Sequence, residues 1–204
     1  MHENEEFKRW EERFRVPEYV FGKKPNSFLK SCEALLPAKG KALAIADGEG
    51  RNGVWLAERG LDVVSIEFSP TAQKKAIALA KERGVTVAFE QADVHGWRYP
   101  EATFDLVADI FTQFSSPSER TTKWRGVRQT LKPGGLLILQ GYTPKQLQYG
   151  TGGPKQIDQL YTRDMLKEAF GDFRDVTIIE EEVEMHEGPA HSGMSAVINL
   201  TAWK

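Results

Sequence analysis

The stretch Lys41–Glu67, KALAIADGEGRNGVWLAERGLDVVSIE, decides the fold of this chain. It begins with the apolar run 42–46, enters a glycine-containing turn at 47–53, and continues in a helical pattern that stops at Gly60. This order is typical of a buried strand, a tight turn and a helix. A second apolar run then ends on Glu67, so the stretch predicts two parallel strands joined by a helix, with a carboxylate at the end of the second strand.

The glycine turn also carries a signal for a ligand. Gly48–Gly53 has the pattern G-x-G-x-x-G, and Glu67 lies near the distance at which an acidic residue takes ribose hydroxyls in dinucleotide sites. Asp47 and Glu49 favour a different ligand, because a pyrophosphate requires bare N–H groups and a positive helix end. Two carboxylates suit a cation such as S-adenosylmethionine, which carries an ammonium, a sulfonium and an adenosine.

Three alternatives to this interpretation stay open. The literal glycine pattern and Glu67 support an NAD(P)-dependent oxidoreductase. A non-catalytic module that binds S-adenosylmethionine for regulation has the same sequence features. The third alternative is a glycine turn that binds nothing.

Length and composition limit the class of protein. The 204 residues suit one domain and are too few for a cofactor domain with a separate substrate domain. With 27 Lys and Arg against 29 Asp and Glu, no basic field indicates nucleic acid or an anionic membrane. One cysteine, Cys32, excludes an intramolecular disulfide and is interpreted as structural. Without a signal-peptide core or a membrane-length apolar run, we expect a cytoplasmic protein.

The expected single domain, residues 1–204, divides into three parts. Residues 1–36 predict an N-terminal helical segment that covers the ligand. Residues 41–142 contain the cofactor-binding core, and residues 143–204 contain the substrate side and the closing strands.

Aromatic residues recur in the N-terminal segment. Residues 4–15 predict a helix with Asn4 as its cap, and 28–36 predict a second short helix. Trp10 and Tyr19 are expected either to lie over a bound ligand or to pack in a core, and the sequence leaves both open.

Strand and helix patterns alternate regularly beyond the glycine turn. Further strands are predicted at 85–89, 104–111, 136–139, 176–179 and 196–201, with helices from Ser69-Pro70 to Arg83-Gly84, from Ser116-Pro117 to 131–135, and from about Thr162. Such repetition predicts an α/β fold with a doubly wound parallel sheet, in which ligands bind at the carboxyl ends of the strands. Asp47, Glu67, Asp93 and Asp109 would lie at that edge, although an ordinary Asx turn also explains Asp93.

The C-terminal part offers two further candidates. The glycine-rich residues 149–155 are either a substrate lid or a flexible connector. His186 and His191 have the spacing of a metal pair, but no third ligand is near, so no metal site is expected. His191 immediately precedes a strand that returns to the sheet edge, which makes it the candidate catalytic residue.

The order of these features resembles the class I S-adenosylmethionine-dependent methyltransferases over about residues 7–203. Its most specific pieces are the turn 48–52, Glu67, Asp93 and the segment 131–135. Within that class the chain looks closest to the small bacterial tellurite-resistance and thiopurine-type methyltransferases. The resemblance implies a Rossmann-like, mostly parallel seven-stranded sheet with its last strand antiparallel.

The resemblance also implies the residues that bind S-adenosyl-L-methionine. The glycine turn would meet its methionine part, Glu67 its ribose, Phe68 and Asp93-Val94 its adenine, and Asp109-Ile110 would form the floor near the sulfonium. The implied cofactor-binding residues are Trp10, Tyr19, Asp47, Gly48, Glu49, Gly50, Asn52, Glu67, Phe68, Asp93, Val94, Asp109 and Ile110.

Two departures from the class pattern affect the expected chemistry. Alignment on the glycine turn places Ala44 at the usual acid and Ala46 at the first glycine, so either Asp47 or Glu49 is left to reach the ammonium. Many relatives carry a histidine just past the fourth strand, where this chain has Thr112-Gln113. Without a base there, we expect a small-molecule acceptor with a soft, pre-ionised nucleophile, such as a thiol or a chalcogen oxyanion, and no nucleic-acid or membrane partner.

Overall fold

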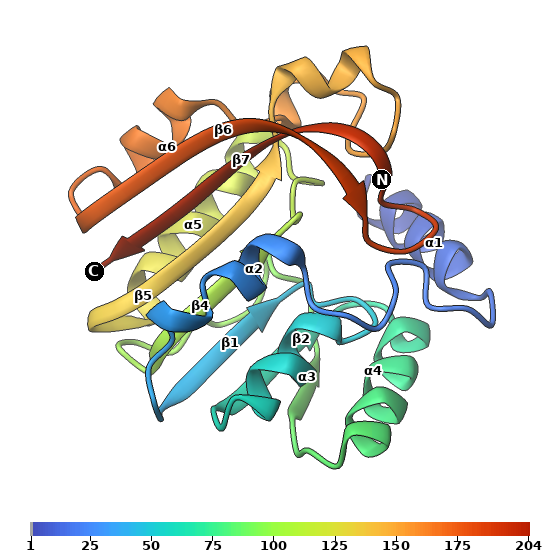
Figure 1. Cartoon of the computed structure of the whole chain (residues 1–204), viewed down its shortest axis with the longest axis horizontal. Coiled ribbons are helices and arrows are strands. Elements are labelled where there is room, and N and C mark those ends of the chain that lie inside the picture. Colours follow the sequence, from blue (N-terminus) through green and yellow to red (C-terminus); the bar gives the residue numbers. More distant parts are fainter. Residues whose placement is uncertain (1) are drawn as a thin grey trace.

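The computed structural model describes residues 2–204, with side chains from residue 5 onward, so the predicted cap Asn4 lies outside the described side chains. The strands are β1 (Lys41–Ile45), β2 (Asp62–Glu67), β3 (Ala88–Gln91), β4 (Phe104–Ile110), β5 (Leu131–Tyr142), β6 (Arg174–His186) and β7 (Ser192–Trp203). They form a seven-stranded sheet in the order β3-β2-β1-β4-β5-β7-β6 (Figure 1). The first five are parallel, and β7 runs antiparallel between β5 and β6, which confirms the predicted sheet.

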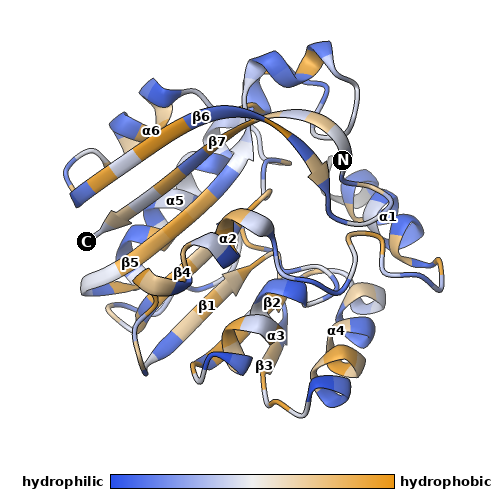
Figure 2. Cartoon of the chain, in the orientation of Figure 1, coloured by the Kyte–Doolittle hydropathy of each residue, from blue (hydrophilic) through white to orange (hydrophobic). Residues whose placement is uncertain are grey.

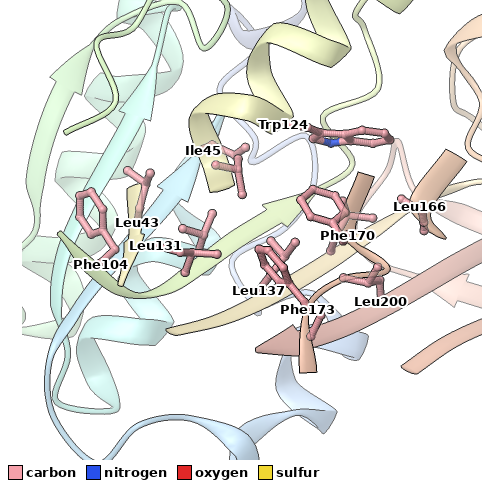
Figure 3. Packing of buried hydrophobic residues seen from close by; sticks show 14 of the residues in the cluster. Leu43, Ile45, Phe104, Trp124, Leu131, Leu137, Leu166, Phe170, Phe173 and Leu200 are labelled. Atoms are coloured by element: carbon pink, nitrogen blue, oxygen red, sulfur yellow. The ribbon is translucent and has the colours of Figure 1, made fainter. Parts of the chain in front are cut away.

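Helices cover both faces of the sheet. The helices are α1 (His2–Phe14), α2 (Ser27–Ser31), α3 (Arg51–Glu58), α4 (Pro70–Arg83), α5 (Pro117–Thr130) and α6 (Arg163–Phe170), with 3-10 turns at Glu33–Leu35, Pro144–Gln148 and Ile157–Gln159. Trp124 of α5 and Phe170 of α6 pack with Leu137 on one face (Figure 3). Leu29 of α2 and Leu56 of α3 pack with Ile138 on the other. The sheet is therefore doubly wound.

Hydropathy follows this layering. Figure 2 shows hydrophobic residues along the central strands and a mixture of hydrophobic and hydrophilic residues on the helices. Helices that place one face against a sheet have this mixed character. Among the described residues, no helix is both long enough and apolar enough to cross a membrane.

Local signals set the ends of α4, as predicted. Ser69 caps the helix by accepting a hydrogen bond from the backbone N–H of Ala72 at 3.0 Å, and Pro70 is the first helical residue. Gly84 ends the helix in the left-handed conformation, with φ of 68°. A proline at the start and a glycine at the end fit the requirements of each terminus.

Two of the predicted elements have different bounds in the structure. β3 begins at Ala88 rather than at residue 85, because its register is set by pairing of Val64 with Ala88 on β2. The predicted helix 28–36 divides into α2 and a 3-10 turn.

The two closing strands are longer than predicted. Cα pairing runs from Arg174 with Trp203 to His186 with Ser192, although 180–184 is rich in glutamate. β6 is an edge strand with mostly exposed side chains, so the apolar alternation that marks a strand in sequence is absent there.

Candidate active site

A pocket lies at the carboxyl ends of β1, β2 and β4, and we call it the turn pocket. It is lined by Trp10, Phe14, Phe21, Ala46, Asp47, Gly48, Arg51, Asn52, Glu67, Phe68, Ile110, Phe111, Phe114 and His191. These residues come from the N-terminal segment, the glycine turn, three strand ends and the β6–β7 turn. The pocket therefore combines distant parts of the chain at the edge where a doubly wound sheet binds ligands.

Glu67 is held rigidly at the end of β2. One carboxylate oxygen accepts a hydrogen bond from the backbone N–H of Gly48 at 2.8 Å, and the other accepts from that of Ser69 at 2.8 Å. Burial raises the pKa of Glu67 to about 7 despite these two donors. A buried carboxylate with two fixed oxygens is suited to accept a pair of hydroxyl groups.

Asp47 and Glu49 have different surroundings. Asp47 lines the turn pocket, where its carboxylate accepts hydrogen bonds from the backbone N–H of Gly53 at 3.1 Å and the hydroxyl of Ser65 at 2.9 Å. Burial raises the pKa of Asp47 to about 6. Glu49 lies outside the lining and forms an ion pair with the Lys75 ammonium on α4 at 2.7 Å. Of the two acids, only Asp47 faces the pocket.

The backbone of the glycine turn includes residues with positive φ angles. Ala46, at the position where the class pattern has a glycine, adopts φ of 44°. Gly50 has φ of 84°, and a β-carbon there would lie 2.5 Å from the β-carbon of Ala76 on α4. Gly50 therefore allows α4 to approach the turn, whereas Gly48 lines the pocket itself.

Arg51 is a pocket residue that sequence reasoning missed. Its guanidinium forms an ion pair with Glu187 of the β6–β7 turn at 2.8 Å, and both side chains are buried. It also donates a hydrogen bond to the carbonyl oxygen of Phe21 at 3.2 Å. The position of Arg51 at the start of α3, directly after the glycine turn, could have indicated a pocket residue. Its ion-pair partner Glu187 lies far along the chain and could not be found from the sequence. Arg51 supplies a positive charge beside the two acids Asp47 and Glu67.

Aromatic rings form the side of the pocket next to β2. Phe68 and Phe114 lie nearly parallel, with ring centroids 6.3 Å apart and an angle of 4° between the planes. Asp93 lies in a neighbouring groove that also contacts both rings. It accepts a hydrogen bond from the backbone N–H of His95 at 2.9 Å, and hydrogen bonding to His95 lowers the pKa of Asp93. Val94 is buried in the core beneath.

Other predicted residues lie away from the turn pocket. Tyr19 packs towards α4, where its hydroxyl donates a hydrogen bond to the carbonyl oxygen of Lys75 at 2.9 Å. Asp109 is fully buried, accepts a hydrogen bond from Thr112, and lies 3.9 Å from the Lys123 ammonium of α5. The predicted residues outside the pocket lining are Tyr19, Glu49, Gly50, Asp93, Val94 and Asp109. Their contacts with a cofactor stay predictions.

The N-terminal segment closes the turn pocket. Trp10 and Phe14 stack with ring centroids 5.5 Å apart, and Phe21 packs against both. The loop that carries Phe21 is held by the β6–β7 turn, where the N–H of Ala190 donates to the carbonyl oxygen of Val20 at 3.1 Å. The free space is about 70 Å³, whereas sites for medium-sized ligands measure about 300–1,000 Å³. A nucleoside therefore requires these rings to move.

His191 joins the turn pocket to a second one. Its ring lies 4.6 Å from that of Phe21 and 4.7 Å from that of Phe111, measured between centroids. Burial, helped by the positive charges of Arg51 and Arg13, lowers the pKa of His191 to about 3. The imidazole is therefore neutral at physiological pH.

The second pocket, which we call the loop pocket, has a volume of about 280 Å³. It is lined by Arg9, Trp10, Arg13, Phe21, Phe111, Gln113, Phe114, Tyr142, Gly153, Pro154, Lys155, Gln156, Gln159 and His191. The predicted lid or connector at 149–155 thus supplies part of its wall. Among the described residues, no group of three or more His, Cys, Asp or Glu is placed to hold a metal ion.

Comparison with known proteins finds a family match over part of the chain. Residues 42–135 match the family described as a methyltransferase domain. The matched segment is a methyltransferase domain, and the match supports the class I S-adenosylmethionine-dependent methyltransferase that the sequence resemblance implied. The matched range includes the glycine turn, Glu67 and Asp93, which are the residues on which the sequence resemblance rested.

One curated relative of this methyltransferase domain is the demethylmenaquinone methyltransferase of Deinococcus radiodurans, which is 29% identical over 116 residues. That match covers 56% of this chain and 48% of the relative. The chain spans about half the length of the curated relatives it matches.

Solved structures share the fold. A protein studied for the conversion of a disulfide bond into a thioacetal group during echinomycin biosynthesis matches with a TM-score of 0.74 and 19% identity, over 96% of this chain and 88% of that one. The N-methyltransferase NodS from Bradyrhizobium japonicum, solved with S-adenosyl-L-homocysteine, matches with a TM-score of 0.70 and 13% identity, over 97% of each chain. The closer likeness to tellurite-resistance and thiopurine enzymes stays a prediction.

The chemistry of the turn-pocket lining suits S-adenosylmethionine once the aromatic rings have moved. Glu67 offers two fixed oxygens to a ribose, and Asp47 offers a negative charge to the ammonium or sulfonium. Arg51 is paired with Glu187 through one end of its guanidinium, so only its remaining N–H groups would bind the carboxylate of the methionine part, and Phe68 with Phe114 presents flat faces to an adenine. These residue assignments stay predictions.

Proposed function

We propose that the chain transfers the methyl group of S-adenosylmethionine to a small acceptor with a soft nucleophile, such as a thiol or a chalcogen oxyanion, by in-line displacement. The observation that carries this proposal is the junction of the two pockets. Trp10, Phe21, Phe111, Phe114 and His191 line both of them. A cofactor in the turn pocket and an acceptor in the loop pocket would therefore meet at these shared walls.

The cofactor supplies a methyl group that is already activated by the positive sulfonium. The lone pair of a thiolate forms the new bond to the methyl carbon, while the pair of the breaking carbon–sulfur bond returns to the cofactor sulfur and leaves a neutral thioether. The thiol loses its proton to solvent before the transfer. The task of the protein is to hold the two reacting atoms in line at about 3 Å and to exclude water.

His191 supports a mechanism of alignment. With a pKa of about 3, its imidazole is a weak proton acceptor at neutral pH. Its contacts with Phe21, Phe111 and Tyr142 instead fix one wall of the junction. We interpret His191 as a residue that shapes the acceptor site.

A test of this function combines turnover with a variant of His191. The protein should methylate 3-mercapto-1-propanol at a rate that follows the thiolate fraction, rising with pH up to the pKa of the thiol. His191→Ala should raise the Michaelis constant and change the turnover number little when chemistry is limiting. Loss of turnover by about 10²–10⁴ at saturating thiolate, with binding intact, would show that His191 is a base.

The rival functions predict different results in the same experiments. A regulatory module would bind S-adenosylmethionine and methylate no acceptor. A nicotinamide enzyme would bind NAD or NADP more tightly than S-adenosylmethionine in calorimetry. Binding of S-adenosylmethionine in the micromolar range, about −8 kcal/mol, without comparable nicotinamide binding supports our proposal.

A further inference from the structure

The charged residues that line the loop pocket are all positive. Its charged lining residues are Arg9, Arg13 and Lys155, all exposed at its mouth, and among the described residues that line it there is no Asp or Glu. The whole chain has a net charge of −2, so this positive mouth is a local feature. A concave site lined by one sign of charge attracts a ligand of the opposite sign.

Arg13 is the cation of this group that is best placed to bind a ligand. Its guanidinium lies 5.3 Å from the ring centroids of both Trp10 and Phe21, which hold it at the pocket wall. Arg9, by contrast, forms an ion pair with Glu6. Within the described part of the chain Arg13 has no carboxylate within ion-pair distance. It thus has both a fixed position and an unused charge.

Two buried polar atoms lie in the same pocket. The hydroxyl of Tyr142 and Nδ1 of His191 are buried, and neither has a hydrogen-bond partner among the described residues. The Tyr142 side chain is only 2% exposed, and that of His191 8%. Burial raises the pKa of Tyr142 well above its ordinary value, so its hydroxyl remains a donor. Buried polar groups are nearly always satisfied in native proteins, so such a pair points to a ligand.

We propose that the methyl acceptor carries a carboxylate or another negative group besides its nucleophilic atom, and that Arg13 and the Tyr142 hydroxyl bind this group. Arg13 and Tyr142 line only the loop pocket, whereas His191 lines both pockets. The negative group therefore lies on the far side from the cofactor, and the nucleophile lies beside His191. This inference rests on the proposed function and defines the acceptor class of the same site.

A pair of thiols of similar size tests the proposal. 3-Mercaptopropionate carries a carboxylate where 3-mercapto-1-propanol carries a hydroxyl, and the two are compared at equal thiolate concentration. We expect kcat/KM to be at least about tenfold higher for the carboxylate. Arg13→Gln should lower kcat/KM for 3-mercaptopropionate by about 10–100-fold, as expected for a charge-assisted hydrogen bond, and leave the neutral thiol within about twofold.

Two further variants separate a binding role from a general effect. Tyr142→Phe should lower kcat/KM for the carboxylate thiol several-fold, with less effect on the neutral thiol. Arg15→Gln removes the same charge from the same segment, but Arg15 pairs with Glu12 and lies outside the loop pocket, so both thiols should react as in the wild type. Binding of S-adenosylhomocysteine should be equal in all variants.

Calorimetry with 3-mercaptopropionate in the presence of S-adenosylhomocysteine gives a readout that is independent of turnover. Wild-type protein should bind it, and Arg13→Gln should bind it at least about tenfold more weakly. Equal losses for both thiols, no preference for the carboxylate, or binding that does not depend on Arg13 would overturn the inference. If neither thiol is methylated while Arg13-dependent binding persists, the proposed thiol methylation fails and the anionic subsite stands.

Discussion

Ala46 combines a side chain with a backbone conformation that favours glycine. Its φ of 44° places the β-carbon close to the following carbonyl oxygen, which costs about 1–2 kcal/mol for residues other than glycine. Ala46→Gly should therefore raise the free energy of unfolding by about 0.5–1 kcal/mol, after the larger entropy of the unfolded glycine is subtracted. Chemical denaturation measures this change.

Ala102 provides a matched control for that substitution. It has a similar φ of 43° but lies in a turn away from both pockets. Ala102→Gly should give a similar gain in stability and leave cofactor binding unchanged. A loss of stability in Ala46→Gly alone would mean that the methyl group makes contacts worth more than the backbone strain.

Glu67 should make cofactor binding depend on pH. Its pKa of about 7 in the free protein means that the carboxyl is increasingly protonated below pH 7, when one oxygen can no longer accept freely from a ribose hydroxyl. Affinity for S-adenosylmethionine should therefore be about tenfold weaker at pH 6 than at pH 8. Calorimetry at the two pH values checks this. Glu67→Gln should bind about 1.5–3 kcal/mol more weakly at pH 8 and lose most of the pH dependence.

The same shift affects the stability of the free protein. Because the pKa of Glu67 in the folded state is raised above its ordinary value of 4.5, its contribution to stability is present below pH 4.5 and is lost as the pH rises through about 7. Asp47, whose pKa rises to about 6, acts in the same direction. Saturation with S-adenosylmethionine should reduce this loss if Glu67 binds the cofactor as the carboxylate.

At the scale of elements, the β6–β7 turn contacts the N-terminal segment that forms one wall of the turn pocket. Gly188 in this turn has φ of 81°, and a β-carbon there would lie 2.5 Å from the backbone nitrogen of Gly22. Gly188→Ala should therefore push the turn away from the N-terminal segment and loosen the wall that contains Phe21. We expect affinity for S-adenosylmethionine to fall about tenfold, as measured by calorimetry, while the sheet stays folded by circular dichroism.

Gly84 is a suitable control for this prediction. It has φ of 68°, but a β-carbon there would meet no atom within 4 Å. Gly84→Ala should cost about 1 kcal/mol of stability and leave cofactor affinity unchanged. Equal affinities in the two variants would contradict a role of the β6–β7 turn in closing the pocket.

Elements with local signals could be predicted from the sequence. The glycine turn and the caps of α4 are set by residues within a few positions of each other, so the bounds of α4 were correct. The full length of β6 was not predicted, because its glutamates face solvent on an edge strand and only pairing with β7 makes the segment a strand.

At the scale of the whole molecule, the site depends on contacts that sequence spacing does not contain. Position at a strand end predicted Glu67 and Asp47 at the pocket, but it did not show that Asp109 faces Lys123 on α5. The ion pair of Arg51 with Glu187 joins two residues that lie far apart in the sequence. Such long-range pairs could not be found from local patterns, which is why Trp10, Glu67 and His191 were predicted at the site and the pocket role of Arg51 was not.

The contacts between the β6–β7 turn and the N-terminal segment also determine when the cofactor site is completed during protein synthesis. Residues 10–21 leave the ribosome long before residues 187–191. The aromatic side chains of the N-terminal segment therefore lack their contacts with the β6–β7 turn while the central strands form. A nascent chain that lacks the last hairpin therefore lacks a closed cofactor site. Since a ligand stabilises only the state that binds it, S-adenosylmethionine would protect finished chains from proteolysis and leave interrupted ones exposed.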